Sequence, residues 1–462
     1  MNRSDTIAAP ATPPGVSALA VIRVSGPDAL SITGKVFRSN TKDWESAKGY
    51  TAHFGRFSDL EGNLLDEVVA TVFRSPRSFT GEDAVEFSFH GSEYIRKRAM
   101  EILVEAGCRV ADPGEFTLRA FLNGKMDLSQ AEAVADLIAS DAAGSHRLAI
   151  EQMRGGYMIK LKELRERLVN LASLLELELD FSEEDVEFAD RTQLYKLLED
   201  MISELTRLSD SFASGNVIRE GIPVAIIGKP NAGKSTLLNH ILGEERAIVS
   251  EIAGTTRDTV EEELILNGTR FRFIDTAGLR ETGDTIESIG VSRSHEKARI
   301  AHVIIYLFDP GDTDPSELET AMKGLEKIKA GQAYTVIPVA NKSDLYPHLL
   351  LTQNYGHIPG ILFISARNDR HLDELLGALS SYASALSQSS GDVMVSNVRH
   401  KEAFDKALRA LQLTEEGIRQ KLTTDLLAVH LRSAINYLGE ITGQVTSDEI
   451  LGNIFSRFCI GK

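Results

Sequence analysis

The chain has 462 residues, of which 50 are Lys or Arg and 67 are Asp or Glu, so its formal net charge is −17. This length predicts about two to four domains and excludes a single small module. Charged residues at 25% and apolar residues at 42% are ordinary globular values, which exclude a largely disordered or fibrous chain. Because the net negative charge of the chain repels phosphates, any contact with a nucleic acid requires a local basic patch.

The two cysteines, Cys108 and Cys459, are too few and too far apart for a disulfide framework, so we expect free thiols in a reducing compartment. The first residues lack the apolar core of a signal peptide. The longest apolar runs, such as residues 303–308, fall far short of the ~20 residues that span a bilayer. These features predict a soluble, cytoplasmic protein without membrane contact.

The N-terminal region predicts an α+β domain, because short strands alternate there with turns and a helix. In residues 84–89, apolar and polar side chains alternate, which is typical of a half-buried strand. Residues 18–24 and 68–73 have the same character. Residues 92–106 predict a helix that ends at Gly107.

Helical patterns follow, and an α/β pattern interrupts them. Ser129 and Glu132 have the spacing of a capping box. A leucine stripe at helical spacing predicts a helix face packed against neighbouring helices: Leu161, Leu164, Leu168, Leu171 and Leu175. We therefore expect a multidomain fold in which an α/β domain is inserted into a split α-helical domain, whose halves pack together. The predicted domains are residues 1–122 (α+β), 123–218 and 386–462 (helical), and 219–385 (α/β).

Residues 228–235 read G-K-P-N-A-G-K-S and follow the apolar strand at residues 224–227, which matches the phosphate-loop pattern G-x-x-x-x-G-K-[ST] in its expected context. The glycines allow backbone N–H groups and the N-terminus of the next helix to face a phosphate. Lys234 is placed to reach the β- and γ-phosphates, and Ser235 to bind Mg²⁺. On its own this pattern serves ATP as well as GTP.

Three further motifs in the expected order favour GTP. After the strand at residues 271–274, Asp275 is placed to hold magnesium through water and Gly278 to turn toward the γ-phosphate. Asp344 lies in N-K-S-D, where its carboxylate can accept two hydrogen bonds from guanine, a donor pair that adenine lacks. Asn341 in the same motif is placed to brace this loop against the phosphate loop. Residues 365–367 offer a backbone N–H to the guanine carbonyl.

Residues 254–258, G-T-T-R-D, lie between the first two motifs and predict a nucleotide-sensing switch. Thr256 is the residue we expect to complete the magnesium shell while the γ-phosphate is present. The alternative is that the two threonines only form a turn.

The groups that carry out hydrolysis have alternatives in this sequence, because Leu279 follows the D-x-x-G motif where many small GTPases have a water-orienting Gln. The charge that an arginine finger supplies must come from Arg257, Arg280 or a bound cation. Asn231 either coordinates a monovalent cation near the β- and γ-phosphates or only stabilises its loop. Glu287 either orients the attacking water or is a solvated helix-face carboxylate.

With these motifs in place, the chain closely resembles the MnmE (TrmE) family of tRNA-modification GTPases, nearly from end to end. That family has an N-terminal domain similar to the folate-binding domain of aminomethyltransferases, which also forms a homodimer, and a split helical domain that carries the GTPase domain. The resemblance rests on the motifs above and on residues 11–15, 78–83, 113–117, 120–127 and the terminal F-C-I-G-K at 458–462.

The resemblance implies a biochemical role as well as a fold. Family members act with the FAD-dependent partner MnmG (GidA). Together they add a carboxymethylaminomethyl or aminomethyl group to carbon 5 of the wobble uridine of certain tRNAs. The one-carbon unit comes from 5,10-methylenetetrahydrofolate, for which 5-formyltetrahydrofolate is an analogue. Because this chain is acidic, we expect most tRNA contacts to come from the partner.

The resemblance also assigns residues. It implies potassium bound by Asn231, Ser250, Ile252 and Thr255, magnesium bound by Ser235 and Thr256, and Glu287 as the water-orienting group. It implies folate contacts from Arg23, Glu86, Lys125 and Lys462, with Cys459 near that pocket as a candidate for chemistry. The predicted GTP contacts are Asn231, Ala232, Gly233, Lys234, Ser235, Thr236, Ser250, Thr255, Thr256, Asp275, Thr276, Ala277, Gly278, Asn341, Lys342, Asp344, Ser365, Ala366 and Arg367.

Alternatives accompany these assignments. Arg23 and Glu86 also fit a cross-strand surface pair. Cys459 stands fourth from the end, as in a prenylation box, but Gly461 is not aliphatic and no polybasic run precedes it, so we exclude lipidation. A ribosome-assembly GTPase has the same nucleotide motifs, but the RNA-binding appendage common in such proteins is not evident in this sequence. A dimeric scaffold with a vestigial nucleotide site does not suit an intact phosphate loop.

Overall fold

A computed structural model of the chain divides into two compact units, and each unit is described by itself. The first comprises Met1–Ile138, Gln152–Ser173 and Leu431–Lys462, and the second comprises Ala139–Glu151 and Leu174–His430. The structure describes residues 5–39, 43–180, 191–244, 262–274, 297–328, 334–389, 394–420, 422–456, 458–459 and 461–462. Within these ranges, no helix is both long enough and apolar enough to cross a lipid bilayer.

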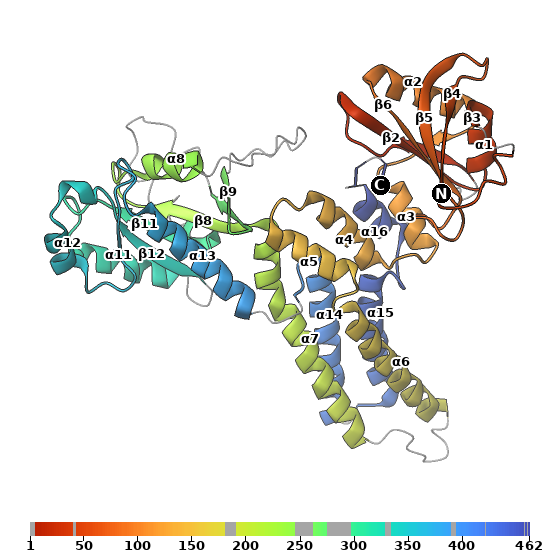
Figure 1. The fold of residues 1–462 in the computed structure, drawn as a ribbon. Coiled ribbons are helices and arrows are strands. Elements are labelled where there is room, and N and C mark those ends of the chain that lie inside the picture. The colour runs from red at the N-terminus through yellow and green to blue at the C-terminus, as the bar shows by residue number, and fades with distance from the viewer. Residues whose placement is uncertain are drawn as a thin grey trace. The chain divides into compact units, whose positions relative to one another are not determined.

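The N-terminal part of the first unit is a seven-stranded sheet. Neighbouring strands are antiparallel, except that the strands at residues 7–10 and 109–110 pair in parallel. Two helices, α1 (Ala29–Val36) and α2 (Glu93–Ala106), contact each other and pack on the sheet (Figure 1). The strand order is β3 (Phe37–Ser39), β4 (Thr51–Ser58), β5 (Leu64–Phe73), β6 (Ala84–Gly91), β2 (Ser17–Ser25), β1 (Ile7–Pro10) and β7 (Arg109–Val110).

The alternation predicted for residues 84–89 is confirmed in β6. Val85, Phe87 and Phe89 are fully buried against α1 and α2, while the polar residues between them are half-buried. The helix predicted over residues 92–106 is also confirmed as α2. It ends at Gly107, whose φ of 123° is a conformation that glycine adopts without steric cost.

The predicted capping box at Ser129 and Glu132 is wrong, because α4 (Leu128–Ala139) begins one residue before Ser129. The reciprocal bonds form two residues earlier. The Gln130 amide donates to the Asp127 carboxylate at 2.9 Å, and the Asp127 amide donates to the Gln130 side-chain oxygen at 2.9 Å. Ser129 is instead fully buried, and its hydroxyl accepts a bond from Gln152 at 3.2 Å. Asp127 therefore caps the helix because it precedes the first helical residue.

The predicted leucine stripe lies on α6 (Met158–Asp180), which follows α5 (Ala143–Met153). Its described members are at most 6% exposed, which confirms that this face packs inside the protein. The side chain of Leu175 lies outside the described residues. The buried members are Leu161, Leu164, Leu168 and Leu171.

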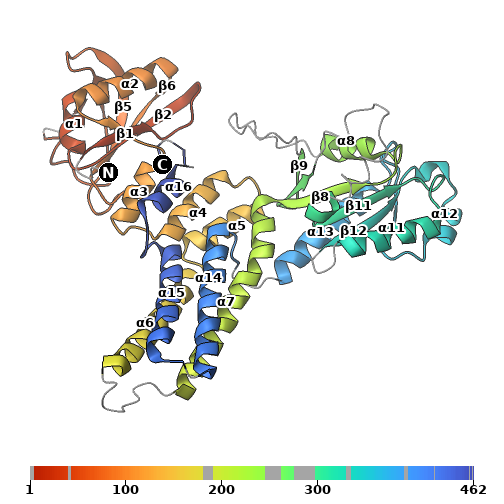
Figure 2. The ribbon, with the colours of Figure 1, turned by 180° about the vertical axis from the view of Figure 1, so that it is seen from behind.

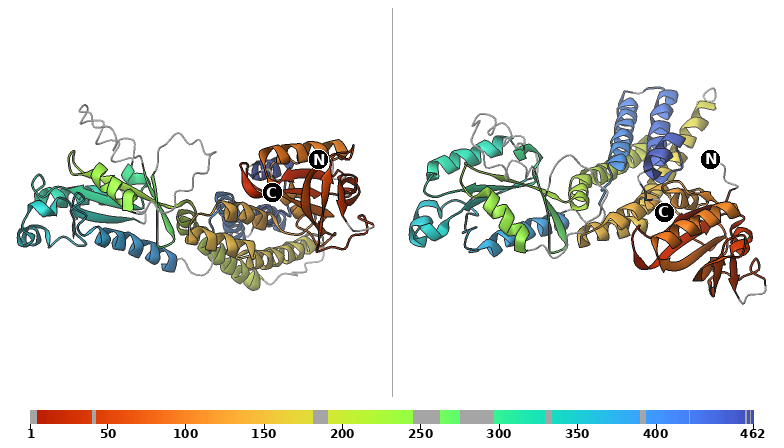
Figure 3. Two further views of the ribbon diagram at one scale, coloured as in Figure 1. Left: turned by 45° about the horizontal axis from the view of Figure 1, so that its top comes forward. Right: turned by 90° about the horizontal axis from the view of Figure 1, so that it is seen from above.

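The C-terminal segment of the chain returns to the N-terminal sheet (Figures 2 and 3). It follows α15 (Thr424–Thr442) and α16 (Asp448–Phe455), and α16 contacts α3 (Glu115–Leu122). Gly461 lies so close to β1 that an added Cβ would be 2.0 Å from the Pro10 carbonyl oxygen. The last residue is held through its backbone, since the Phe116 amide donates to the Lys462 carbonyl oxygen at 3.2 Å.

The second unit contains the predicted α/β domain. All neighbouring strands are parallel except the edge strand β9, which is antiparallel to β10. The strand order is β13 (Leu362–Phe363), β12 (Thr335–Ala340), β11 (Val303–Phe308), β8 (Ile222–Ile227), β10 (Thr269–Phe273) and β9 (Glu262–Leu266). Within the described residues, the helices of this domain are α8 (Lys234–Glu244), α11 (Pro315–Ile328), α12 (His348–Tyr355) and α13 (Leu372–Ser389).

The helices that flank the α/β domain in sequence, α7 (Arg191–Glu220) and α14 (Val398–Arg419), lie side by side (Figures 1 and 2). The Ser209 hydroxyl donates to the Asp405 carboxylate at 2.7 Å, which joins the two helices directly. The chain therefore leaves a helical region, forms the α/β domain and returns to pack on the helix it left. This arrangement confirms the predicted insertion.

Candidate functional site

The phosphate loop follows β8 and depends on two glycines. An added Cβ at Gly228 would lie 1.9 Å from the Leu307 carbonyl oxygen of β11. At Gly233, with φ of 96°, an added Cβ would lie 2.3 Å from the Asn341 side-chain nitrogen. Asn231 also has a left-handed backbone, with φ of 62°, and its side chain is exposed. The loop therefore wraps tightly because two positions carry no side chain.

Lys234 begins α8, and its ammonium lies inside the loop. It donates to the carbonyl oxygens of Gly228 at 2.9 Å and Lys229 at 2.7 Å. Burial, followed by the charge of Lys297, lowers the pKa of Lys234. Ser235 and Thr236 occupy the next positions of the first helical turn. A cation, a hydroxyl pair and a helix N-terminus at one glycine loop suit a nucleotide phosphate with Mg²⁺.

Asn341, at the end of β12, connects the phosphate loop to the guanine motifs. Its side-chain N–H donates to the Ala232 carbonyl oxygen at 2.8 Å, and its side-chain oxygen accepts from the Ala366 amide at 3.0 Å. Asn341 is 3% exposed, so both bonds lie away from water. Because β8, β12 and β13 are parallel, their carboxyl ends place these three motifs at one edge of the sheet.

The guanine motif contains a residue that sequence reasoning missed. The Asn368 side chain donates to the Asp344 carboxylate at 2.9 Å, and the Asn368 amide donates to the Ser365 hydroxyl at 3.3 Å. Ser365 is buried, whereas Arg367 is exposed. Asn368 thus holds the carboxylate of Asp344, the residue that the sequence predicts to bind guanine. In the sequence, the only pointer to Asn368 is its position directly after the S-A-R motif at residues 365–367.

Several predicted site residues lie outside the described residues. They belong to the two segments that precede β9 and follow β10. They are Ser250, Ile252, Thr255, Thr256, Asp275, Thr276, Ala277, Gly278 and Glu287, together with Arg257 and Arg280.

The first unit contains a small cavity at the N-terminal sheet. Arg23 on β2 and Glu86 on β6 are register partners, and their side chains form an ion pair at 2.7 Å. The Arg23 guanidinium lies 5.3 Å from the Phe79 ring centre and 5.5 Å from the Phe116 ring centre. The cross-strand pair predicted as the alternative is therefore present, and both residues also line the cavity, together with Phe73, Phe79, Thr80 and Ala84.

The C-terminal Lys462 joins this group. Its ammonium lies 5.8 Å from the Phe79 ring centre. Burial, followed by the charge of Arg23, lowers the pKa of Lys462, and Glu86 opposes this effect. Lys125 contacts the loop that carries Phe79 at another point. Its ammonium donates to the Pro76 carbonyl oxygen at 2.8 Å.

Cys459 is an exposed free thiol, whereas Cys108 is a buried one. Burial raises the pKa of Cys108 to about 12, so this thiol stays protonated and behaves as part of the core. Only the exposed Cys459, three residues before Lys462, has the access that a reactive thiol requires.

The residues at the cavity are compatible with part of a folate. A cation, a carboxylate and an aromatic ring suit a head group that both donates and accepts hydrogen bonds. The cavity volume of about 120 Å³ resembles the space that one aromatic ring fills. It is well below the ~300–1,000 Å³ of a whole small-molecule site. The enclosed space therefore suits a ring, with the remainder of a larger ligand outside it.

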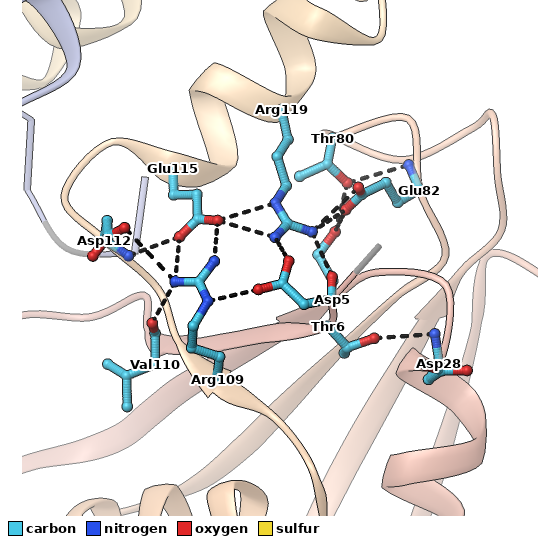
Figure 4. Close-up of polar contacts among 11 residues, drawn as sticks. Asp5, Thr6, Asp28, Thr80, Glu82, Arg109, Val110, Asp112, Glu115 and Arg119 are labelled. Atoms are coloured by element: carbon cyan, nitrogen blue, oxygen red, sulfur yellow. Dashed lines mark hydrogen bonds and ion pairs between the residues drawn. The ribbon is translucent and has the colours of Figure 1, made fainter. Parts of the chain in front are cut away.

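A buried network of charges holds the loop that carries Phe79 (Figure 4). Arg119 on α3 bonds Asp5 at 2.6 Å, Glu115 at 3.0 Å and Glu82 at 3.3 Å, and its side chain is 8% exposed. Glu82 in turn accepts from the Ser25 hydroxyl at 2.8 Å. Arg119 thus ties together the start of the chain, α3 and the loop beside the cavity.

The motif order, the parallel sheet and the closed phosphate loop define the α/β domain of the second unit as a P-loop GTPase domain. Sequence comparisons then identify the family within this class. The family description "MnmE helical domain" matches residues 128–459, and "GTP-binding protein TrmE N-terminus" matches residues 6–125.

Curated relatives match over the full length. The tRNA modification GTPase MnmE of Flavobacterium psychrophilum is 51% identical over 460 residues, which cover 99% of each chain. That of Flavobacterium johnsoniae is 51% identical over 470 residues, which cover 100% of each chain. A solved structure of Era from Aquifex aeolicus, bound to GDP and AlF4, is 27% identical, covers 41% of this chain and 67% of that one, and has a TM-score of 0.25. This chain belongs to the MnmE family of tRNA modification GTPases.

Proposed function

We propose that this member of the MnmE family is a potassium-activated GTPase that acts with the FAD-dependent partner MnmG. Together they add a carboxymethylaminomethyl or aminomethyl group to carbon 5 of the wobble uridine of certain tRNAs. That the chain is a GTP hydrolase of tRNA modification follows from its full-length relatives. Beyond this, we propose the activation by potassium, the homodimer, the partner MnmG and the folate one-carbon donor.

One observation carries the one-carbon part of this proposal. Arg23, Glu86 and Lys462 come from the two ends of the chain, yet they meet around one aromatic ring. We assign folate binding to these three residues and to Lys125. The bound tetrahydrofolate supplies the one-carbon unit. Arg23 and the Glu86 carboxylate bind its head group at the cavity, and Cys459 is the candidate thiol near the same site.

In the GTPase domain, we assign the phosphates to Lys234 and the amides of the glycine loop, and guanine to Asp344. Ser235 and Thr256 are the proposed magnesium ligands. Asn231, Ser250, Ile252 and Thr255 are the proposed potassium ligands. Glu287 is the proposed water-orienting residue. The exposed side chain of Asn231, beside the loop that Lys234 occupies, supports its assignment to a cation at the phosphates.

GTP turnover in potassium and in sodium at equal ionic strength tests the cation. We expect strong activation by potassium, and we expect Asn231→Ala to lose it. Asn239→Ala, on an exposed position of α8, is the matched control and keeps the activation. Equal rates in both salts would transfer the missing positive charge to Arg257, Arg280 or a partner.

A deletion strain tests the pathway. We expect loss of the wobble-uridine modification with a normal profile of ribosomal particles. Intact modification with defective ribosome assembly would favour the rival function, a ribosome-assembly GTPase.

The tRNA contact is tested separately. With a net charge of −17, the chain alone is expected to bind tRNA weakly, and the complex with MnmG tightly. Tight binding by the chain alone, with a steep dependence on salt, would contradict this division.

A further inference from the structure

Asp309 lies directly after β11, at the edge of the sheet where the nucleotide motifs meet. It belongs to no motif that the sequence analysis recognised, and it is 8% exposed. Its carboxylate accepts three hydrogen bonds: from the Lys342 ammonium at 2.7 Å, the Tyr346 hydroxyl at 3.0 Å and the Gly311 amide at 2.9 Å. A buried carboxylate with three donors is a fixed point of the structure.

Two of these donors flank the guanine-recognising residue. Lys342 stands two residues before Asp344, and Tyr346 stands two residues after it. Between them the chain forms a short 3₁₀ turn, Ser343–Leu345, and Lys342 enters this turn with a left-handed φ of 59°. A non-glycine residue in that conformation costs energy, so other contacts must hold it there. The Asp309 carboxylate binds both sides of the turn and supplies such contacts.

The segment that carries Asp309 is itself fixed. An added Cβ at Gly311 would lie 2.2 Å from the Tyr346 hydroxyl, so the two segments are in close contact. The Tyr355 hydroxyl donates to the Thr313 carbonyl oxygen at 2.5 Å. The Asp309 carboxylate is therefore attached to a rigid support and not to a free loop end.

Asp309 carries its charge at neutral pH. Burial acts to raise the pKa of its carboxyl, but the hydrogen bonds from Lys342, the Gly311 amide and Tyr346 hold this pKa below its usual value. The bond to Lys342 is thus a pair of opposite charges, and the bond to Tyr346 is charge-assisted.

We propose that Asp309 and Tyr346 are positioning residues for guanine recognition, which hold Lys342 and the turn that presents Asp344 to the base. The two residues act on the base and not on the phosphates. Their loss therefore weakens the binding of GTP and of GDP by the same factor and leaves the rate of the chemical step unchanged. This inference rests on the proposed assignment of guanine to Asp344, and it does not depend on potassium, folate or the partner.

The test compares Asp309→Asn and Tyr346→Phe with the parent chain. Asp309→Asn removes the charge and keeps the shape. We expect about tenfold or greater weakening of both GTP and GDP binding, since charge-assisted bonds are roughly twice as strong as neutral ones. Tyr346→Phe removes one hydroxyl, and we expect about threefold weakening in the same direction. Affinities of fluorescent GTP and GDP analogues, together with KM and kcat for GTP, give the readout.

Asp373→Asn is the matched control, because Asp373 is an exposed carboxylate in the first turn of α13 in the same domain. It should keep the parent affinities. A raised KM with unchanged kcat, and equal losses for GTP and GDP, support the proposal. Unchanged affinities in Tyr346→Phe, or a loss confined to GTP or to kcat, overturn it. If Asp309→Asn does not fold, Tyr346→Phe still decides the question.

Discussion

The phosphate loop and the N-terminal cavity differ in what holds their residues in place. In the loop, Gly228 and Gly233 leave no room for a side chain, and backbone groups form the site. In the cavity, Arg23, Phe79 and Lys462 come from distant parts of the chain, and ion pairs hold Arg23 to Glu86 and the loop of Phe79 to Arg119. A backbone site is therefore sensitive to an added atom, whereas a side-chain site is sensitive to a lost charge.

The largest expected effect comes from removing the buried charge at the cavity. Arg119→Met leaves Glu82 without its cation and removes one of the two arginines that pair with Asp5 and Glu115, since Arg109 remains. We expect the first unit to lose about 3–5 kcal/mol of unfolding free energy, because breaking a buried ion pair leaves uncompensated charges. Urea unfolding followed by the fluorescence of Trp44, the only tryptophan in the chain, measures this unit.

Arg98→Met is the control for this change, since Arg98 forms partly exposed pairs on α2, with Glu101 at 3.1 Å. It should leave the free energy of unfolding nearly unchanged, because pairs in contact with water contribute little. Equal effects of the two substitutions would show that the buried network does not hold the unit together.

A smaller effect is expected from adding one carbon to the phosphate loop. Gly228→Ala places a Cβ against the Leu307 carbonyl oxygen, and we expect a loss of about 1–3 kcal/mol together with weaker GDP binding. Gly243→Ala adds the same carbon to α8 where no atom lies within 4 Å, and it should be neutral or slightly stabilising. Trp44 lies in the first unit and does not report on this domain. Far-UV circular dichroism therefore measures the unfolding of the second unit in the two glycine variants.

At the cavity, we expect Arg23→Met to weaken the binding of 5-formyltetrahydrofolate about tenfold, or ~1.4 kcal/mol, because a buried cation is lost. Arg56→Met removes an exposed arginine of the same sheet, which lies 3.6 Å from Glu67. It should leave binding unchanged. Isothermal titration calorimetry gives both affinities, and equal affinity in both variants would remove Arg23 from the folate site.

The smallest expected effect is a dependence on pH. Burial acts to raise the pKa of Glu115, but bonds from Arg109, the Asp112 amide and Arg119 hold it below its usual value of 4.5. A lowered pKa stabilises the folded form above the usual value, and this contribution disappears as the pH falls through the lowered pKa. Below pH 4.5, the first unit should therefore lose stability more steeply than its Glu115→Gln variant, as Trp44 fluorescence reports. Parallel slopes would contradict this.

The predictions from sequence succeeded where the contacts are local. The alternation in β6 and the turn at Gly107 involve neighbours within a few residues, and both were found. The capping box failed by two residues, because both Asp127 and Ser129 satisfy the pattern and only burial of Ser129 decides between them.

The sequence by itself determined the phosphate loop, the guanine motifs and the alternation of strands and helices, because spacing and side-chain type define these features along the chain. Only the tertiary structure decided that Lys462 meets Arg23 beside Phe79, and that Asp309 reaches Lys342 and Tyr346. These contacts depend on strand order, register and the return of the C-terminal segment to β1. Residue spacing does not encode such neighbours, since packing over the whole unit selects them.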